Sequence, residues 1–428
     1  MEDLAGKTDV EDAAVADNPG TSRRFIIVDD DRIAAGHARA LLTRAGHEVL
    51  GVFQSSPEGL EVIRRERPDA VLTDIMMPEL DGLELTQRLR AEPDLADMKI
   101  FVFSGKAFDY DRRRALEVGA DAFIQKPIKG PVFLETVERV IADRIAVRFW
   151  GVRGTLPKPG PDSLRYGGNT NCITLTFPRG QFFIFDAGSG IRDVGDHLLK
   201  AGKMRTEGKI FISHPHWDHI NALPFFAPLY IPGNDYEILG PTHGSKGIGD
   251  LVSDQMDGAY FPITTREFGA RVTFSDLREG SYEVAGLKVR TMLLSHPGYC
   301  LGYRVDYGDR SFCYITDNEM FLPDSDYHAP DYMEQLADFV RGTDMLVTDT
   351  TYSDAEYPSK EGWGHSSVGQ VVELACMAEV KELCLYHHDP SQDDDAIDAK
   401  LAAAQEIIAA RGSAVRCTCP AEGQSVLI

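Results

Sequence analysis

The sequence predicts an α/β protein with two main domains, of which the first is built on a doubly wound parallel sheet. Its 428 residues exceed the usual size of a single domain. From Phe25 onward, short runs of β-branched and aromatic residues alternate with segments of helical periodicity. Strands that alternate with helices form a parallel sheet covered on both faces, so we expect this architecture for the first domain.

The elements of the first domain follow one another in a regular order. Strands are predicted at 25–28, 71–73, 100–103 and 122–124, and helices at 33–45 and 131–144. Pro131 suits the first turn of the closing helix, where a backbone N–H would have no partner within the helix. Residues 1–24 are rich in Ala, Asp and Glu and poor in large apolar residues, which predicts a disordered acidic tail.

Polar residues follow these strands where each strand ends. They are Asp29 and Asp30 after the first strand, Asp74 after the second, Ser104 after the third and Lys126 after the fourth. Open parallel sheets bind ligands at the carboxyl ends of their strands. Crowded carboxylates repel one another unless a hard cation neutralises them, and Mg²⁺ together with a Lys suits a transferring phosphoryl group. The pattern therefore predicts a magnesium-dependent phosphoryl site.

These residues resemble the receiver domain of bacterial two-component response regulators, which has a flavodoxin-like fold. The resemblance implies that Asp74 is the phosphoacceptor, that Asp29 and Asp30 hold Mg²⁺, and that Ser104 and Lys126 meet the phosphoryl oxygens. Phe123 matches the aromatic switch position of the family. The resemblance also implies a partner, either a cognate histidine kinase or a phosphotransfer protein.

The second domain begins almost directly after the closing helix of the first. No Gly/Ser linker separates that helix from the apolar run at 145–150. The junction is therefore predicted to be stiff, so that strain in the first domain can reach the second. The predicted organisation is a tail at 1–24, a receiver domain at 25–144 and a second domain at 145–428.

The most informative stretch of the second domain is a cluster of metal-ligating residue types. His214, His216, Asp218 and His219 fall within six positions, directly after the apolar run 209–212. Imidazole nitrogens and carboxylate oxygens are accepted ligands of Zn²⁺ and its first-row neighbours. Four ligands at this spacing suit two metals that share one site better than a single tetrahedral ion.

The pattern His-x-His-x-Asp-His resembles the metal motif of the metallo-β-lactamase fold, particularly its binuclear hydrolases. The resemblance implies an αββα architecture and three further ligands that each follow an apolar strand, namely His296, Asp317 and His387. It assigns one metal to His214, His216 and His296, the other to Asp218, His219 and His387, and Asp317 to both as a bridge. Two divalent ions are expected, Zn first and Mn or Fe as alternatives. His388 stays an alternative to His387.

Other residues extend this site by resemblance. Asp186, which ends an apolar strand, is expected to orient the metal ligands, and Asn169 in a Gly-rich stretch offers a supporting amide. Asp349 and His365 resemble an auxiliary motif of ribonuclease Z and related phosphodiesterases. A carboxylate beside an imidazole raises its basicity, which suits His365 to protonating a leaving alkoxide. The alternative for His365 is a structural or capping role before a helix that starts at residues 366–367.

These features predict a binuclear metal-dependent hydrolase with Asp218, Asp349 and His365 among its catalytic residues. The favoured activity is a phosphodiesterase that acts on a small phosphodiester, such as a cyclic one, under the control of Asp74 phosphorylation. Three alternatives stay open: hydrolysis of a thioester, lactone or lactam; a diiron oxygen or redox sensor; and a signalling scaffold with a degenerate site. His216 counts against the diiron sensor, and the filled ligand positions count against the scaffold.

Composition narrows the partners and the compartment. The net charge of −23 disfavours long nucleic acids, because binding to phosphates requires a basic surface. No apolar run approaches the ~20 residues that span a membrane. Seven cysteines, an odd number without a Cys-x-x-Cys pair, predict reduced thiols in the cytoplasm. A homodimer is left open.

Overall fold

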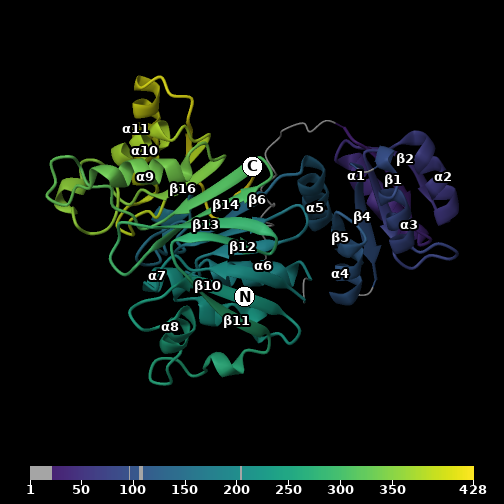
Figure 1. Ribbon diagram of the computed structural model, residues 1–428, viewed down its shortest axis with the longest axis horizontal. Coiled ribbons are helices and arrows are strands. Elements are labelled where there is room, and N and C mark those ends of the chain that lie inside the picture. The colour runs from purple at the N-terminus through teal and green to yellow at the C-terminus, as the bar shows by residue number, and fades with distance from the viewer. Residues whose placement is uncertain (1–21, 96, 106–108, 203–204) are drawn as a thin grey trace, which may run out of the picture. The chain divides into compact units, whose positions relative to one another are not determined.

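The structure, a computed structural model, describes residues 22–95, 97–105, 109–202 and 205–428. Residues 1–21, which make up most of the predicted tail, lie outside the described residues. Backbone contacts divide the chain into two compact units, one up to Phe103 and the other from Ser104 onward. Figure 1 labels the elements of both units.

The first unit alternates strands and helices. Its elements are β1 (Arg24–Val28), α1 (Arg32–Arg44), β2 (Glu48–Phe53), α2 (Ser56–Glu66), β3 (Ala70–Asp74), α3 (Gly82–Arg90) and β4 (Lys99–Ser104), whose last residue opens the second unit. Every residue of β3 is buried, as expected for a strand covered on both faces. The residues of β2 are exposed or partly buried, and this strand was not predicted, although four of its six residues are apolar and only Gly51 interrupts them.

The second unit begins with α4 (Asp109–Glu117), β5 (Ala122–Gln125) and α5 (Gly130–Ala142). The five-stranded sheet has the order β2-β1-β3-β4-β5, which is the flavodoxin-like order of a doubly wound fold. In this sheet β1 pairs in parallel with β2 and β3, and β3 pairs in parallel with β4. The predicted fold class of the first domain is confirmed.

The rest of the second unit is a sandwich of two seven-stranded sheets with helices on its outer faces (Figure 1). The sheets have the orders β11-β10-β9-β8-β7-β6-β19 and β12-β13-β14-β15-β16-β17-β18. The strands of the first sheet are β6 (Ala146–Gly151), β7 (Cys172–Thr176), β8 (Phe182–Phe185), β9 (Glu207–Phe211), β10 (Asp235–Pro241), β11 (Arg271–Leu277) and β19 (Ser425–Leu427). Those of the second are β12 (Gly280–Val284), β13 (Leu287–Leu293), β14 (Leu301–Tyr307), β15 (Arg310–Ile315), β16 (Met345–Asp349), β17 (Glu382–Tyr386) and β18 (Arg416–Thr418).

Apolar side chains form three layers in this sandwich. Between the sheets, the rings of Phe185 and Phe211 stack 5.2 Å apart, and Tyr303 of the opposite sheet lies 5.7 and 5.4 Å from them. Two outer layers lie under the helices, which are α6 (Ile191–Lys200), α7 (Trp217–Ile220) and α8 (Ile248–Gln255) on one face and α9 (Pro330–Val340), α10 (Val368–Met377) and α11 (Asp394–Ala410) on the other. This αββα arrangement confirms the predicted architecture.

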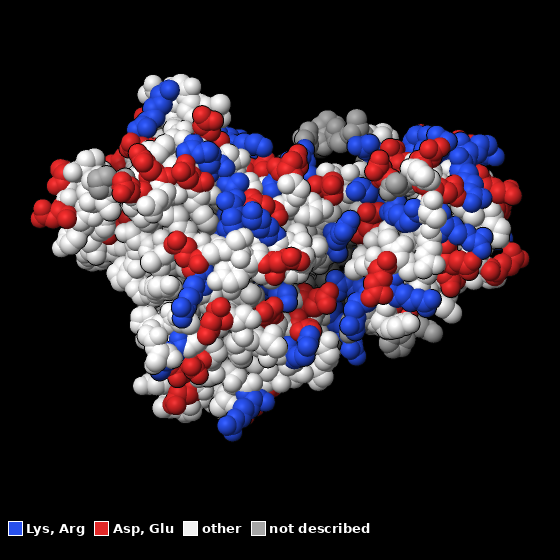
Figure 2. Space-filling view, viewed as in Figure 1, with Lys and Arg blue, Asp and Glu red and all other residues white. Residues whose placement is uncertain are grey.

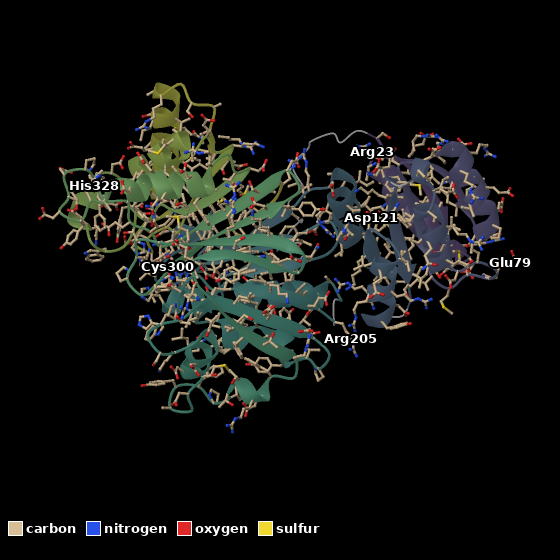
Figure 3. The ribbon with its side chains drawn as sticks, viewed as in Figure 1. Arg23, Glu79, Asp121, Arg205, Cys300 and His328 are labelled. Carbon is tan, nitrogen blue, oxygen red and sulfur yellow. The ribbon has the colours of Figure 1, made fainter. Side chains whose placement is uncertain are left out.

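Loops at one end of the sandwich carry the predicted metal ligands. The loop after β9 leads through His214 and His216 into α7, while β13, β15 and β17 end shortly before His296, Asp317 and His387. Figure 3 marks this end with Cys300, which lies between β13 and β14. A rigid sheet can hold ligands from distant sequence positions in one place.

The connection from α5 to β6 is three residues long, Asp143 to Ile145. Ile145 is buried and exchanges two backbone hydrogen bonds with Ile428, each of 3.0 Å. Arg139 of α5 is also buried, which lowers the pKa of its guanidinium to about 10, and it donates to the backbone carbonyls of Phe177 and Pro178 beyond β7. These bonds tie α5 to the first sheet of the sandwich.

The sequence analysis also made expectations about the cysteines and about membrane-spanning segments. All seven cysteines are free thiols. Among the described helices, none combines the length and the apolar character that crossing a membrane requires.

Candidate metal centre

Three imidazoles and one carboxylate converge at the first half of the centre. The Nε2 atom of His214 lies 2.8 Å from Nδ1 of His216, and Nε2 of His296 lies 3.2 Å from that same Nδ1. The Oδ2 atom of Asp317 lies 3.5 Å from Nε2 of His214 and 3.6 Å from Nε2 of His296. The four ligand atoms all lie within 4.8 Å of one another, which is the spacing of a metal site.

The second half of the centre uses the other oxygen of Asp317. Its Oδ1 atom lies 3.1 Å from Nε2 of His219 and 3.0 Å from Nε2 of His387. Asp218 completes this group, with Oδ2 3.2 Å from each of the same two nitrogens. Asp317 therefore lies between the two groups, as expected of a bridging carboxylate.

Three residues at this centre have left-handed backbone angles. Asp317 and His387 have positive φ angles of 33° and 60°, and Asp186 has one of 59°. L-residues rarely adopt this conformation, and where it persists it is usually part of a functional site.

The donor set fits divalent metal ions by its charge as well as its spacing. Burial lowers the pKa of His214 well below its usual value, and it also lowers that of His216, so both rings are neutral and keep a lone pair for a metal. Burial opposes ionisation of Asp218 and Asp317, but neighbouring histidines outweigh it and hold the pKa of each carboxyl well below its usual range. Burial opposes protonation of His219, but Asp218 and Asp317 outweigh it and raise the pKa of His219 well above its usual value. A divalent cation would neutralise these carboxylates in place of that proton.

Asp186 orients His219, a ligand of the second half of the centre, by contacting the ring nitrogen that faces away from Asp317. Its carboxylate accepts hydrogen bonds from Ser213 N (2.7 Å), Ser213 Oγ (2.9 Å) and the Tyr314 hydroxyl (2.7 Å), and its Oδ2 lies 2.6 Å from Nδ1 of His219. The bond to Nδ1 leaves Nε2 of His219 to face Asp317. Such a contact fixes the tautomer and orientation of a ligating histidine.

The structure brings the amide of Asn171, and not that of the predicted Asn169, against a carboxylate of the centre. The Nδ2 atom of Asn169 donates to Asp193 and Glu422, at 3.0 and 3.2 Å. The Nδ2 atom of Asn171 instead lies 3.3 Å from Oδ2 of Asp218. The two residues are only two positions apart in an irregular loop, so sequence alone could not order them.

Two glycines let the backbone pass close behind ligating rings. A Cβ atom on Gly154 would lie 2.1 Å from Cε1 of His387. One on Gly364, which has a φ of +87°, would lie 2.3 Å from Nδ1 of His296. The Gly364 carbonyl accepts a hydrogen bond from that Nδ1 (2.8 Å), so it orients His296 as Asp186 orients His219.

The structure distinguishes His387 from its neighbour His388. Both rings are buried, but Nε2 of His387 faces Asp218 and Asp317. Neither ring nitrogen of His388 has a hydrogen-bond partner among the described residues, and neither belongs to a ligand group found in them. The geometry therefore favours His387 as the ligand.

Asp349, which is buried, and His365, which is partly buried, form a pair beside the centre. Nδ1 of His365 lies 2.8 Å from Oδ2 of Asp349, and the His365 ring stacks on that of His387 at 5.0 Å. Burial opposes the charged ring, but Asp349 outweighs it and raises the pKa of His365 to about 9. The cap of α10 is Ser367, in a capping box with Gln370, so His365 does not cap that helix.

The predicted receiver residues lie at the carboxyl ends of their strands. In the first unit, Asp29 follows β1 and is buried, Asp30 is exposed, and Asp74 ends β3 with its Oδ2 accepting from Met76 N at 2.7 Å. In the second unit, Ser104 ends β4, and its carbonyl accepts from Lys126 N at 2.8 Å. Phe123 lies in β5 and is partly buried.

Comparisons with known proteins agree with this arrangement. The response regulator receiver domain matches residues 25–138. The polar-differentiation response regulator DivK of Brucella anthropi is 32% identical over 121 residues, which are 28% of this chain and 98% of DivK. The chain belongs to the response-regulator family. Response regulator MprA of a Mycobacterium species is 36% identical over 140 residues, and this match spans 33% of the chain but only 55% of MprA.

Further along this response regulator, residues 183–388 match the β-lactamase superfamily domain. That range contains every residue of the two ligand groups and the Asp349–His365 pair. The response regulator therefore carries a metallo-β-lactamase-fold domain after its receiver domain. The metallo-β-lactamase fold protein YhfI of Bacillus subtilis is 16% identical, with a TM-score of 0.47 over 67% of the response regulator and all of YhfI.

Several supporting residues of the response regulator were missed by the sequence reasoning. Thr155 N donates to Asp218 Oδ2 at 2.8 Å, and Thr351 Oγ1 lies 2.6 Å from Asp349 Oδ1 and 2.9 Å from His387 Nδ1. Glu319 is 1% exposed and accepts backbone bonds from Gly362 and Gly364. Thr351 lies two residues after Asp349, and Glu319 lies two residues after Asp317. This closeness to a predicted site carboxylate was the sequence signal that could have identified them.

Proposed function

We propose that this response regulator is a binuclear metal-dependent phosphodiesterase for a small phosphodiester, and that phosphorylation of Asp74 controls it. We assign the receiver domain to residues 25–144 and the hydrolase to 145–428. The observation that carries the proposal is the juxtaposition of two metal-ligand groups, joined through Asp317, with a protonatable His365 beside them. Two metal ions, when bound, would lower the pKa of a shared water and neutralise the phosphate oxygens.

The residues of the chain supply the remaining parts of the reaction. Attack by water on phosphorus forms one P–O bond and breaks the bond to the leaving oxygen, which needs a proton unless it is a stable anion. Nδ1 of His365 is paired with Asp349, so the proton would come from Nε2. The high pKa of His365 keeps that proton available at neutral pH.

The Asp349–His365 pair favours a phosphodiester over an acyl substrate. A tetrahedral intermediate of thioester, lactone or lactam hydrolysis can be stabilised by metal ions without a separate acid beside them. The complete ligand set also disfavours a degenerate scaffold, and His216 in the first group disfavours a diiron sensor.

The charge of the chain favours a small substrate over a long nucleic acid. The sequence has 67 acidic and 44 basic residues. Figure 2 shows acidic side chains interspersed among basic ones over the visible face. Binding to a long polyanion usually depends on a continuous basic surface.

Activity against a substrate panel tests the proposal. Purified protein of known metal content should hydrolyse one or more cyclic or linear phosphodiesters, and chelation should abolish this turnover. Thioesters, lactones and β-lactams serve as the comparison. Hydrolysis of an acyl substrate with no activity on any phosphodiester would overturn the assignment.

His365→Ala is expected to slow hydrolysis of substrates with poor leaving groups by about 10²–10⁴-fold, the usual contribution of general acid catalysis. An aryl phosphodiester should be affected much less, because its leaving group departs without a proton. Steady-state kinetics on both substrates measures the difference. His328→Ala is the matched control, since His328 (labelled in Figure 3) hydrogen-bonds the Phe321 carbonyl instead of joining the centre. Equal losses on both substrates would mean that His365 positions the phosphate.

Phosphorylation is expected to change turnover through the connection from α5 to β6. Allosteric coupling is typically worth about 1–3 kcal/mol, or roughly 5- to 150-fold. A flexible Gly/Ser insert after Arg144 should reduce this effect, because it releases α5 from the strand that starts at Ala146.

The measurement is turnover with and without Asp74 phosphorylation, for the native chain and for the insertion. The same insert after Gly286, in the turn between β12 and β13, is the control. Regulation that survives the insert after Arg144 would exclude this route, and unchanged turnover of the phosphorylated native chain would mean that the receiver only localises or dimerises the enzyme.

A further inference from the structure

A short loop beside the metal centre, residues 357–364, exposes an aromatic ring next to a cation. Trp363 is 60% exposed, and Nζ of Lys360 lies 4.1 Å from the centre of its indole ring. The same Nζ lies 5.9 Å from the ring of Tyr352, which in turn packs edge-on against His365 at 5.9 Å. Trp363 and Lys360 are thus linked to the proposed general acid through the ring of Tyr352.

This loop is held rigidly by a buried carboxylate. Oε1 of Glu319 accepts hydrogen bonds from the Tyr357 hydroxyl (3.0 Å) and Gly362 N (2.7 Å), and Oε2 accepts from Gly364 N (2.7 Å). The Gly364 carbonyl then accepts from Nδ1 of His296. Burying a carboxylate is costly unless it is hydrogen-bonded, so these bonds specify one position for the loop relative to a metal ligand.

A second exposed indole borders the same centre. Trp217 stands between the ligands His216 and Asp218 in the sequence and is 78% exposed. Single exposed apolar residues are common on proteins. Here, however, Glu319 holds the backbone on both sides of Trp363 through Gly362 N and Gly364 N. Trp217 directly follows the ligand His216 in the sequence.

We propose that Trp363 and Lys360 form a subsite for the base of a nucleotide whose scissile phosphate lies at the metal centre. The inference rests on the proposed phosphodiesterase and specifies its substrate class. His365 protonates the leaving oxygen, so the group attached to that oxygen lies on the side of Trp363. Nucleic-acid bases stack on aromatic side chains whatever their identity, because every base has a π-face. Lys360 supplies donors for the carbonyl and ring-nitrogen acceptors of a base, and a positive charge in a chain of net charge −23.

The test compares a nucleoside 2′,3′-cyclic phosphate with glycerol 1,2-cyclic phosphate, which has the same reacting group and no base. The ratio of kcat/KM for the two substrates should fall about 10-fold or more in Trp363→Ala, mainly through KM, because the stacking contact is lost. Trp363→Phe should recover most of the ratio, and Lys360→Met should lower it less than Trp363→Ala. Tyr110→Ala, which removes a 66% exposed aromatic ring on α4, is the control for loss of an exposed ring.

Tryptophan fluorescence gives a readout that does not depend on turnover. The chain has three tryptophans, and of these Trp150 is buried. Adenosine 5′-monophosphate should quench the emission of the metal-loaded protein, whereas ribose 5-phosphate at the same concentration should not. Most of this quenching should disappear in Trp363→Phe. The same measurement on Trp217→Phe gives the fraction of the quenching that comes from Trp217.

The outcomes separate this subsite from the proposed activity. If both cyclic phosphates are hydrolysed and Trp363→Ala leaves their kcat/KM ratio and the quenching unchanged, the subsite is wrong and the phosphodiesterase stands. If neither is hydrolysed but the nucleotide quenches Trp363 selectively, the subsite stands and the assigned reaction on these substrates is wrong. Quenching that persists in full in Trp363→Phe overturns the subsite whether or not turnover is seen.

Discussion

Asp317→Ala is expected to release both metals and to abolish turnover. In the native chain, Oδ2 of Asp317 faces His214 and His296, and Oδ1 faces His219 and His387, at 3.0 to 3.6 Å. The substitution removes a ligand from both groups and leaves six ligands, five imidazoles and the Asp218 carboxylate, without their shared anion. Loss of a residue that merely supports a ligand typically costs 10- to 100-fold, so loss of the bridge should cost more than about 100-fold.

Elemental analysis of the purified variant measures this effect directly. The native chain should hold two metals and Asp317→Ala fewer than one. Asp317→Asn keeps the shape and one ligating oxygen, so it should retain part of the metal. Asp309→Ala is the matched control, because the side chain of Asp309, in the turn before β15, is 93% exposed. Two tightly held metals and full activity in Asp317→Ala would overturn the ligand assignment.

Asp74→Asn is expected to abolish phosphorylation of the chain by acetyl phosphate in the presence of Mg²⁺. The amide has nearly the shape of the carboxylate and can still accept the bond from Met76 N, but it is not a nucleophile. The fold should therefore be kept while the acceptor is lost. Intact-protein mass and phosphoryl label measure the stoichiometry.

An exposed carboxylate of the same unit, Asp94, serves as the control for the change of charge in this experiment. Asp94→Asn removes an acidic group that is 68% exposed and pairs with Arg67 at 2.7 Å. It should be labelled like the native chain. Label on Asp74→Asn at native stoichiometry would refute Asp74 as the phosphoacceptor. Loss of regulation in Asp74→Asn without loss of basal turnover would show that the receiver regulates the hydrolase.

In the five-stranded sheet, local sequence patterns indicated the central strands but not the edge strand β2. Strands β1, β3 and β4 were predicted because they are buried on both faces and so read as continuous apolar runs. The edge strand β2 was missed although four of its six residues are apolar; Gly51, a residue type depleted in strands, interrupts them. Its place was decided by pairing with β1, which local sequence does not encode.

The sequence by itself determined which residue types could bind metal and where the chain would present them. His214, His216, Asp218 and His219 lie so close in the chain that their own loop brings them together. Strand ends before His296, Asp317 and His387 indicated further ligands, because a sheet delivers its strand ends to one edge. The chemistry of the side chains and their spacing in the sequence were therefore enough to predict these ligands without knowledge of tertiary contacts.

Only the tertiary structure decided between neighbours and found the residues that hold the ligands in place. It turned His387 and not His388 toward Asp317, and it put Asn171 rather than Asn169 against Asp218. It also placed Glu319 under Gly362 and Gly364. Adjacent side chains in a loop point in different directions set by backbone angles, such as the positive φ of His387, and by contacts with residues far away in sequence. Those contacts exist only once the two sheets have packed together.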